Sequence, residues 1–345
     1  MILSALQPGC PWHRRPGSES RGPCQPDAAR AAKRSRHALE GMTTLLAVFL
    51  AALASPLAAQ QVHRVDDVRL FYHTEGQHAV DAADGNANGI PDQVEDILTQ
   101  VRAARMMLVQ VLGFPEPLKT ERFRAARFID ISFRHKDVLK MNGTAYDELQ
   151  RYNKPGDPPG TLSIAFTVAT SVKAPSNLTP AHEFFHLIQY STTYFKNRWF
   201  LEGTARWSER ALGTGDLGPA RVLSAWPLPD MRKQEIAAMA YDASEHLWNP
   251  LAARFDKNGE LPGSPVLKQL QAMTYTDGTP VLKDLRLTGW AFIRDVVLEL
   301  GQIDDLAFRE LAYDRWSEEN QRSPKNEAFM WCAIEAVARR HAMQR

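Results

Sequence analysis

Hydrophobic residues recur along the chain with two periods, one typical of helices and one typical of strands. Between residues 94 and 112 they return every three or four positions, which predicts a helix that Gly113 ends. Residues 68–72 are typical of a short strand, and 162–170 alternate apolar with small or polar side chains, as a half-buried strand does. A strand over 162–170 is expected to bind an extended peptide by strand addition.

Helical patterns dominate the second half of the chain. A helix is expected to begin with Thr179 as its N-cap and Pro180 at its first position. Further helical patterns occupy 199–209, 239–248 and, between breaks that contain Pro or Gly, 250–345. We therefore predict an α+β fold with a small mixed β-sheet that has an edge strand, the helix that begins near residue 179, and a mostly helical C-terminal part.

The first 59 residues have the features of a leader. Residues 44–54 form an apolar run of eleven, shorter than the roughly 20 residues that cross a membrane. Small residues follow up to Ala59–Gln60, as at a signal-peptidase site. We expect a signal peptide over 42–59, cleavage near that bond, and a secreted or periplasmic protein with no stable membrane anchor; a buried core helix is the alternative. Residues 1–41 are expected to be a disordered leader or to lie upstream of the true start.

Charge is distributed unevenly between this leader and the rest of the chain. Of the 41 Lys+Arg and 40 Asp+Glu in 345 residues, residues 1–41 hold seven and three, so the remainder carries 34 basic and 37 acidic residues. A slightly acidic body offers no electrostatic surface for nucleic acid, so no nucleic-acid partner is expected. The 23% charged and 44% hydrophobic residues indicate a globular protein, with residues 60–345 as one domain.

A calcium-type loop over 84–95 precedes the first predicted helix. Oxygen-bearing side chains stand at positions 1, 3, 5, 9 and 12 of this segment, position 6 is the turn-forming Gly89, and position 7 is Ile90, which offers its backbone carbonyl. This is the spacing of an EF-hand loop, so we predict structural Ca²⁺ there, against the alternative of an ion-free turn that caps the helix. The side-chain ligands would be Asp84, Asn86, Asn88, Asp92 and Glu95.

The strongest chemical signal is the motif His182-Glu183-Phe184-Phe185-His186. On a helix, residues at i and i+4 project from one face, so both imidazoles reach a common point. His-Glu-x-x-His in this arrangement binds Zn²⁺, and the glutamate is placed to activate a metal-bound water. Burial of two histidines and a glutamate among phenylalanines is costly unless a cation compensates.

A second helical segment follows thirteen residues after His186 and supplies carboxylates. Glu202 is the candidate third zinc ligand, which leaves the fourth position open. Glu209 lies two turns further along the same face, where it would orient a ligand from behind. The alternative is an ordinary amphipathic helix whose carboxylates are solvated.

Together, H-E-F-F-H and the following W-F-L-E-G-T-A-R-W-S-E resemble the gluzincins, zinc metallopeptidases of the peptidase-MA type. The nearer likeness is to secreted bacterial putative metallopeptidases that also carry a D-G-N-x-N-G-I-P-D loop near the mature N-terminus. This resemblance implies a zincin-like fold with its active-site region in 160–250, zinc on His182, His186 and Glu202, and Glu183 as the base. Arg206 departs from the pattern, because thermolysin-like members carry a supporting aspartate there.

Tyr241 is a candidate donor to the oxyanion of a tetrahedral intermediate, although it would also suit a packed core, and Tyr190 and Tyr194 compete for the role. The leading hypothesis is a secreted zinc metallopeptidase that acts on protein or peptide substrates through a zinc-bound water and Glu183. The alternatives are a non-catalytic, calcium-stabilised binding or adhesion protein on the same frame, and a zinc hydrolase of non-peptide amide bonds. No partner protein is implied.

Overall fold

The structure, a computed structural model, describes residues 59–151, 154, 156–213, 221–223, 225–256 and 258–343. The predicted leader over 1–41 and the signal peptide up to residue 58 lie outside the described residues. Ala59 and Gln60, the residues that flank the predicted cleavage point, are exposed and directly precede the first strand. Within the described ranges, no helix is both long enough and apolar enough to cross a membrane.

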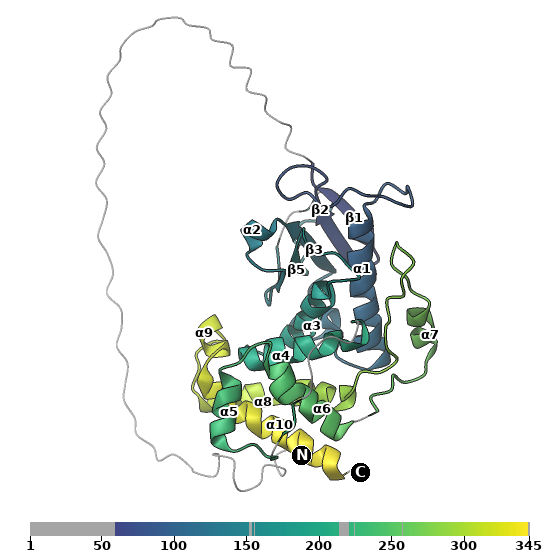
Figure 1. Cartoon of the computed structure of the whole chain (residues 1–345). Coiled ribbons are helices and arrows are strands. Elements are labelled where there is room, and N and C mark those ends of the chain that lie inside the picture. The colour runs from purple at the N-terminus through teal and green to yellow at the C-terminus, as the bar shows by residue number, and fades with distance from the viewer. Residues whose placement is uncertain are drawn as a thin grey trace, which may run out of the picture.

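A five-stranded mixed sheet forms the upper part of the molecule in Figure 1, in the order β1-β2-β3-β5-β4. Strand β2 pairs antiparallel with β1 and parallel with β3, and β5 pairs parallel with β3 and antiparallel with β4. The mixed α and β architecture of the prediction is therefore confirmed. The strands are β1 (Gln61–Val65), β2 (Val68–Tyr72), β3 (Phe128–Arg134), β4 (Gly143–Ala145) and β5 (Ser163–Ala169).

The edge strand is not the one that the sequence pattern indicated. We predicted a half-buried, peptide-binding strand over 162–170, but β5 lies between β3 and β4, and six of its seven residues are buried. The three-residue strand β4 forms the edge instead. The small and polar side chains of β5 predicted a solvent-exposed face, but all except the half-buried Ala165 are buried, and the Thr167 hydroxyl hydrogen-bonds to that of Tyr146.

The first long helix matches its prediction with one change of geometry. Helix α1 (Asp92–Arg105) continues into a π-helical segment, η2 (Met106–Val111), and the chain turns at Gly113 with a positive φ of 74°. A glycine in this left-handed conformation is the common way to end a helix. Strand β2 was also predicted, at 68–72.

Helix α2 lies beside the sheet in Figure 1, and most of the remaining helices lie below it, with α3 between the sheet and the C-terminal helices, among which α8 packs along α10. Their bounds are α2 (Lys136–Leu139), α3 (Thr179–Thr192), α4 (Arg198–Ser208), α5 (Asp230–Ala237), α6 (Asn249–Phe255), α7 (Pro265–Gln271), α8 (Trp290–Glu310), α9 (Glu318–Gln321) and α10 (Glu327–Met343). Single turns are η3 (Pro117–Lys119), η4 (Glu209–Ala211) and η6 (Pro324–Asn326), and a second π-helical segment is η5 (Ser244–Trp248).

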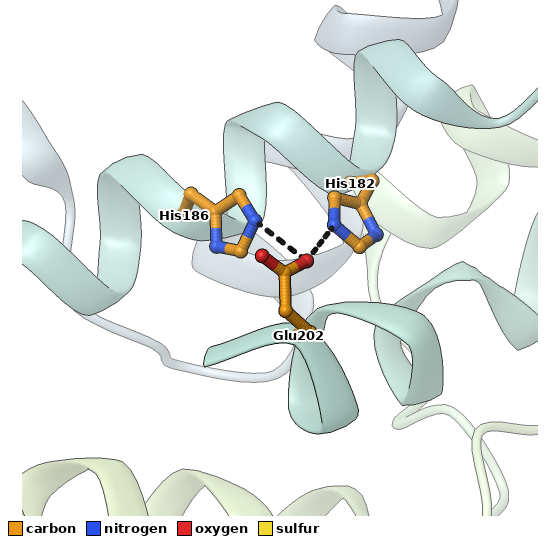
Figure 2. A group of neighbouring side chains, drawn as sticks. All are labelled: His182, His186 and Glu202. Carbon is orange, nitrogen blue, oxygen red and sulfur yellow. Dashed lines mark hydrogen bonds and ion pairs between the residues drawn. The ribbon is translucent and has the colours of Figure 1, made fainter. Parts of the chain in front are cut away.

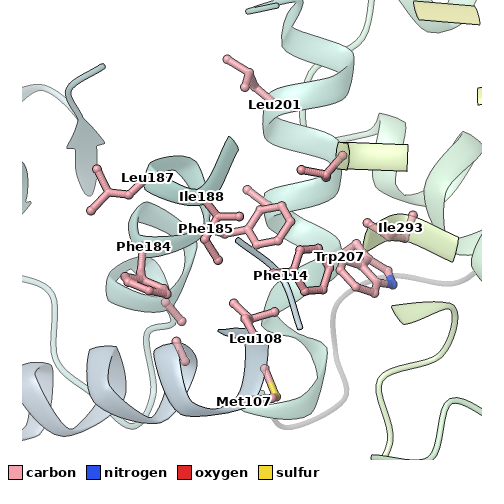
Figure 3. Packing of buried hydrophobic residues seen from close by; sticks show 14 of the residues in the cluster. Met107, Leu108, Phe114, Phe184, Phe185, Leu187, Ile188, Leu201, Trp207 and Ile293 are labelled. Atoms are coloured by element: carbon pink, nitrogen blue, oxygen red, sulfur yellow. The ribbon is translucent and has the colours of Figure 1, made fainter. Parts of the chain in front are cut away.

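Aromatic packing fixes α3 at the centre of the molecule. Phe185 of α3 makes an edge-on contact with Phe114, with ring centroids 5.6 Å apart, and lies 6.2 Å from the ring of Trp207 in α4 (Figure 3). All three side chains are almost completely buried. Burial of each such side chain contributes roughly 1.5–3 kcal/mol, so the helix that carries the candidate site rests on a rigid apolar base.

Candidate metal centre and active-site cleft

The N-cap of helix α3 lies one residue before the position that the sequence predicted. Leu178, not Thr179, precedes the first helical residue and has no capping side chain. The cap comes from Asn177 instead, whose Oδ1 accepts a hydrogen bond from the Thr179 amide at 2.9 Å. Pro180 is therefore the second helical residue and not, as predicted, the first, but it still lies in the first turn, where its missing N–H has no cost. Our assignment of Thr179 as N-cap was wrong because the asparagine two residues upstream is the better acceptor.

The two predicted histidines and Glu202 converge on one point between α3 and α4 (Figure 2). Nε2 of His182 lies 3.3 Å from Oε2 of Glu202, and Nε2 of His186 lies 3.7 Å from the same oxygen. Two ligands of a tetrahedral zinc ion, with bonds of about 2.1 Å, are about 3.4 Å apart. The spacing therefore fits a zinc ion with little rearrangement. Within the described part of the chain, no other three His, Cys, Asp or Glu residues form such a group.

The Nδ1 atom of each histidine, on the side of the ring away from Glu202, contacts a second side chain. Nδ1 of His182 lies 2.7 Å from Oε1 of Glu209, and Nδ1 of His186 lies 2.6 Å from Oε1 of Gln189. Glu209, placed here by η4 rather than by α4, also pairs with Arg206 at 2.9 Å. Partners of this kind orient metal-binding imidazoles and leave the outward nitrogens for the metal.

The excess of carboxylates over imidazoles at this centre favours a bound cation. Burial would lower the pKa of His182, but hydrogen bonds to Glu202 and Glu209 outweigh it and raise the pKa to about 10. Burial would raise the pKa of Glu202, yet the two neighbouring imidazoles, above all His182, lower it strongly. Three carboxylates, those of Glu183, Glu202 and Glu209, thus surround two imidazoles in a largely buried site. A divalent cation would balance this charge, so the donor set fits zinc.

Glu183 is a buried carboxylate with one oxygen available to accept a hydrogen bond or a proton. Its side chain is buried, and Oε2 makes no hydrogen bond to any residue that the structure describes. Burial raises its pKa above the ordinary value, although the nearby His186 and His182 oppose this. The backbone amide of Ala145 in β4 donates to the carboxylate. The neighbouring strand residue is Gly143, where a Cβ atom would lie 2.5 Å from Oε1 of Glu183.

A cleft of about 750 Å³ opens onto this centre. The cleft is lined by His182 and Glu183, together with Gly143, Arg206 and Tyr241. Its remaining lining is largely polar, with Asn142, Ser176, Asn177, Thr179, Asp242, Ser244 and Glu245.

Of the three candidate tyrosines, only Tyr241 lines the cleft. Its ring lies 5.8 Å from that of His182, and its side chain hydrogen-bonds to Glu202. Burial and the Glu202 carboxylate raise the pKa of the phenol, so it stays a hydrogen-bond donor. Tyr190 stacks behind His186, and Tyr194 stacks on Trp316. The predicted helix over 239–248 was partly wrong, because Tyr241 lies in a turn ahead of η5.

The calcium-type loop closes on itself at the start of α1. The Asp84 carboxylate accepts hydrogen bonds from the amides of Asn88 and Gly89, at 3.1 and 2.8 Å. The side-chain amides of Asn86 and Asn88 meet the Glu95 carboxylate at 2.9 and 2.8 Å.

The two remaining predicted ligands, Asp92 and Ile90, make other hydrogen bonds within the loop. Asp92 accepts from the Gly85 amide, and Ile90 donates its amide to Asn88. Four of the predicted side-chain ligands, Asp84, Asn86, Asn88 and Glu95, are thus linked by hydrogen bonds within one loop. The same bonds also describe an ion-free cap, so calcium stays a prediction.

The sequence analysis did not identify two residues that contact the site. Gln189 lies three residues after His186, one turn further along α3, and the amide side chain there was the available signal. Gly143 gave no signal, because only the folded chain brings β4 against α3.

No protein-family model matches the sequence, and no curated protein matches it. The case for chemistry therefore depends on the site itself.

Proposed function

We propose that the protein is a secreted, zinc-dependent metallopeptidase of the gluzincin type, with a zincin-like fold. The observation that carries the proposal is the convergence of His182, His186 and Glu202, with a hydrogen-bond partner on the Nδ1 of each imidazole, beside a cleft that His182 and Glu183 line. A structural metal site has no need of a neighbouring buried carboxylate with one unpartnered oxygen. The arrangement therefore favours hydrolysis over a purely structural site.

Zinc, when bound, would polarise the scissile carbonyl and lower the pKa of a coordinated water. Glu183 would accept the proton that the attacking water loses, because its Oε2 has no competing partner. The same carboxyl would then return the proton to the leaving amine. Tyr241 would donate its phenolic hydrogen to the oxyanion, a role that its exposure to the cleft and its high pKa support.

The edge strand offers a place for the substrate backbone. Asn142 and Tyr146, which flank β4, hydrogen-bond to β5, and Thr144 lies opposite Thr167. In an antiparallel pair, the N–H and C=O groups of alternate residues point away from the partner strand. The backbone groups of Gly143 and Ala145 therefore point away from β5. The Ala145 amide is taken by Glu183, and the other groups can pair with an extended peptide. Strand addition is thus proposed for β4, in place of the strand predicted at 162–170.

A peptide-library digest tests the proposal. The purified protein should cleave members of the library, and a chelator should abolish cleavage that added Zn²⁺ restores. Absence of cleavage by zinc-loaded protein would count against a peptidase and leave the non-catalytic binding protein as the better interpretation.

A second candidate, a zinc hydrolase of non-peptide amide bonds, is favoured by one observation. The cleft lining is mainly amide, hydroxyl and charged groups, including Asn142, Asn177 and Ser244, with few apolar side chains. Such a surface suits a polar substrate as well as a peptide. Chelator-sensitive cleavage of cell-wall fragments without cleavage of any peptide would support this candidate.

A further inference from the structure

Gln189 connects the two helices that carry the metal ligands. It is fully buried in α3, and its Oε1 lies 2.6 Å from Nδ1 of His186. Its Nε2 donates to two groups of α4: the backbone carbonyl of Leu201 at 3.0 Å and Oγ1 of Thr204 at 2.7 Å. Leu201 directly precedes Glu202 in the sequence. One side chain therefore joins the histidine ligand to the segment that holds the third ligand.

The contacts of Gln189 determine which way its amide points. A backbone carbonyl can only accept a hydrogen bond, so the NH₂ group of Gln189 must face Leu201. The Thr204 hydroxyl gives its own hydrogen to the carbonyl of Phe200 at 2.8 Å and is left as an acceptor toward Gln189. Both contacts require the same orientation. The carbonyl oxygen of Gln189 must then face His186.

This orientation in turn fixes the hydrogen on the imidazole. An amide oxygen can only accept, so Nδ1 of His186 must carry hydrogen, and Nε2 of the neutral ring is left with a lone pair. That lone pair points toward Oε2 of Glu202, 3.7 Å away. Two lone pairs across this distance repel each other, and a cation between them would turn the repulsion into coordination.

We propose that Gln189 is a positioning residue. Its hydrogen bonds to α4 fix the orientation of its amide, and this orientation leaves the Nε2 lone pair of His186 available to the metal. The proposal rests on the metal-binding part of the proposed function. Its expected consequence is that removal of the Gln189 oxygen weakens zinc binding by about 10–100-fold. The partner of His182 is the carboxylate of Glu209, so that ring should not respond.

Three variants separate positioning from general support of the fold. Gln189→Met has a similar length but neither accepts from His186 nor donates to α4. Gln189→Glu keeps an acceptor for His186 but loses the donors to Leu201 and should lower the melting temperature. Ser191→Ala is the matched control, because Ser191 is buried in the same helix and, among the described residues, its hydroxyl donates to the carbonyl of Ile188, outside the metal site.

The first readout is the imidazole ¹H–¹⁵N correlation spectrum of the metal-free protein at alkaline pH, and the second is Zn²⁺ affinity by competition with a chromophoric chelator. We expect His186 to carry its hydrogen on Nδ1 in the parent, in Ser191→Ala and in Gln189→Glu, and to show a mixture of tautomers in Gln189→Met. Zinc affinity should fall 10–100-fold in Gln189→Met and stay within about threefold in Gln189→Glu.

The proposal is overturned if Gln189→Met keeps both the parent tautomer and the parent zinc affinity. It is equally overturned if the affinities of the two Gln189 variants fall in step with their melting temperatures, since that pattern indicates support of the fold alone. A parent protein that takes up no zinc would refute the proposed function, whereas the tautomer spectra of the metal-free protein would still decide the role of Gln189.

Discussion

Gly143→Ala should impair catalysis without removal of the metal. A Cβ at this position would lie 2.5 Å from Oε1 and 2.8 Å from Cγ of Glu183, and 2.5 Å from Cγ2 of Thr179. The shortest of these is 0.9 Å below the 3.4 Å at which ordinary contact begins, so either Glu183 or strand β4 must move by about that amount. Both movements disturb the hydrogen bond from the Ala145 amide to the carboxylate.

Misplacement of a reacting group by about 1 Å costs roughly 10²-fold in rate, and added bulk in a packed region costs about 1–3 kcal/mol of stability. We therefore expect kcat/KM on a cleaved library peptide to fall about 10²-fold, with a lower melting temperature and unchanged zinc content. Gly263→Ala is the control, because an added Cβ there meets no atom within 4 Å. Parent-like turnover and melting temperature in Gly143→Ala would refute the contact between β4 and Glu183.

Two further predictions concern stability. Millimolar Ca²⁺ should raise the melting temperature of the parent but not that of Glu95→Gln, because binding to the folded loop alone stabilises by mass action; equal curves with and without Ca²⁺ would contradict an ion at 84–95. Burial raises the pKa of Asp304 to about 6, despite hydrogen bonds from the Tyr194 amide and Thr193, so the folded carboxyl binds a proton between about pH 4 and 6 where the unfolded one does not. In urea denaturation, the stability of the parent relative to Asp304→Asn should therefore rise as pH falls from 7 to 5, and parallel pH profiles would contradict this.

Elements with a strong local signal were predicted well. The helical period up to Gly113 and the apolar residues of β2 are properties of short segments, and the structure contains both elements. The position of β5 was misjudged, because small and polar residues on a strand look the same in sequence whether solvent or protein covers them. Strand β4, with three residues, has no periodicity to detect, and its place at the edge depends on pairing with β5.

The candidate site likewise combines features that follow from local sequence with contacts that depend on tertiary packing. His182 and His186 are one helical turn apart, so their convergence follows from local geometry, and the structure adds Glu202 at the expected place. The contacts of Gln189 with Leu201 and Thr204, and of Gly143 with Glu183, join segments that only tertiary packing brings together. The ion pair of Arg206 with Glu209, by contrast, joins residues three positions apart and is local.

Zinc content measured beside peptidase rate in Glu183→Gln and Glu202→Ala tests the central claim most directly. Glu183→Gln keeps the size of the side chain but cannot accept a proton, so turnover should fall by about 10²–10⁴-fold while zinc stays bound to His182, His186 and Glu202. Glu202→Ala should lose zinc affinity first and activity as a consequence. Parent-like turnover in Glu183→Gln would contradict the hydrolytic account, and parent-like zinc affinity in Glu202→Ala would show that the third ligand is misassigned.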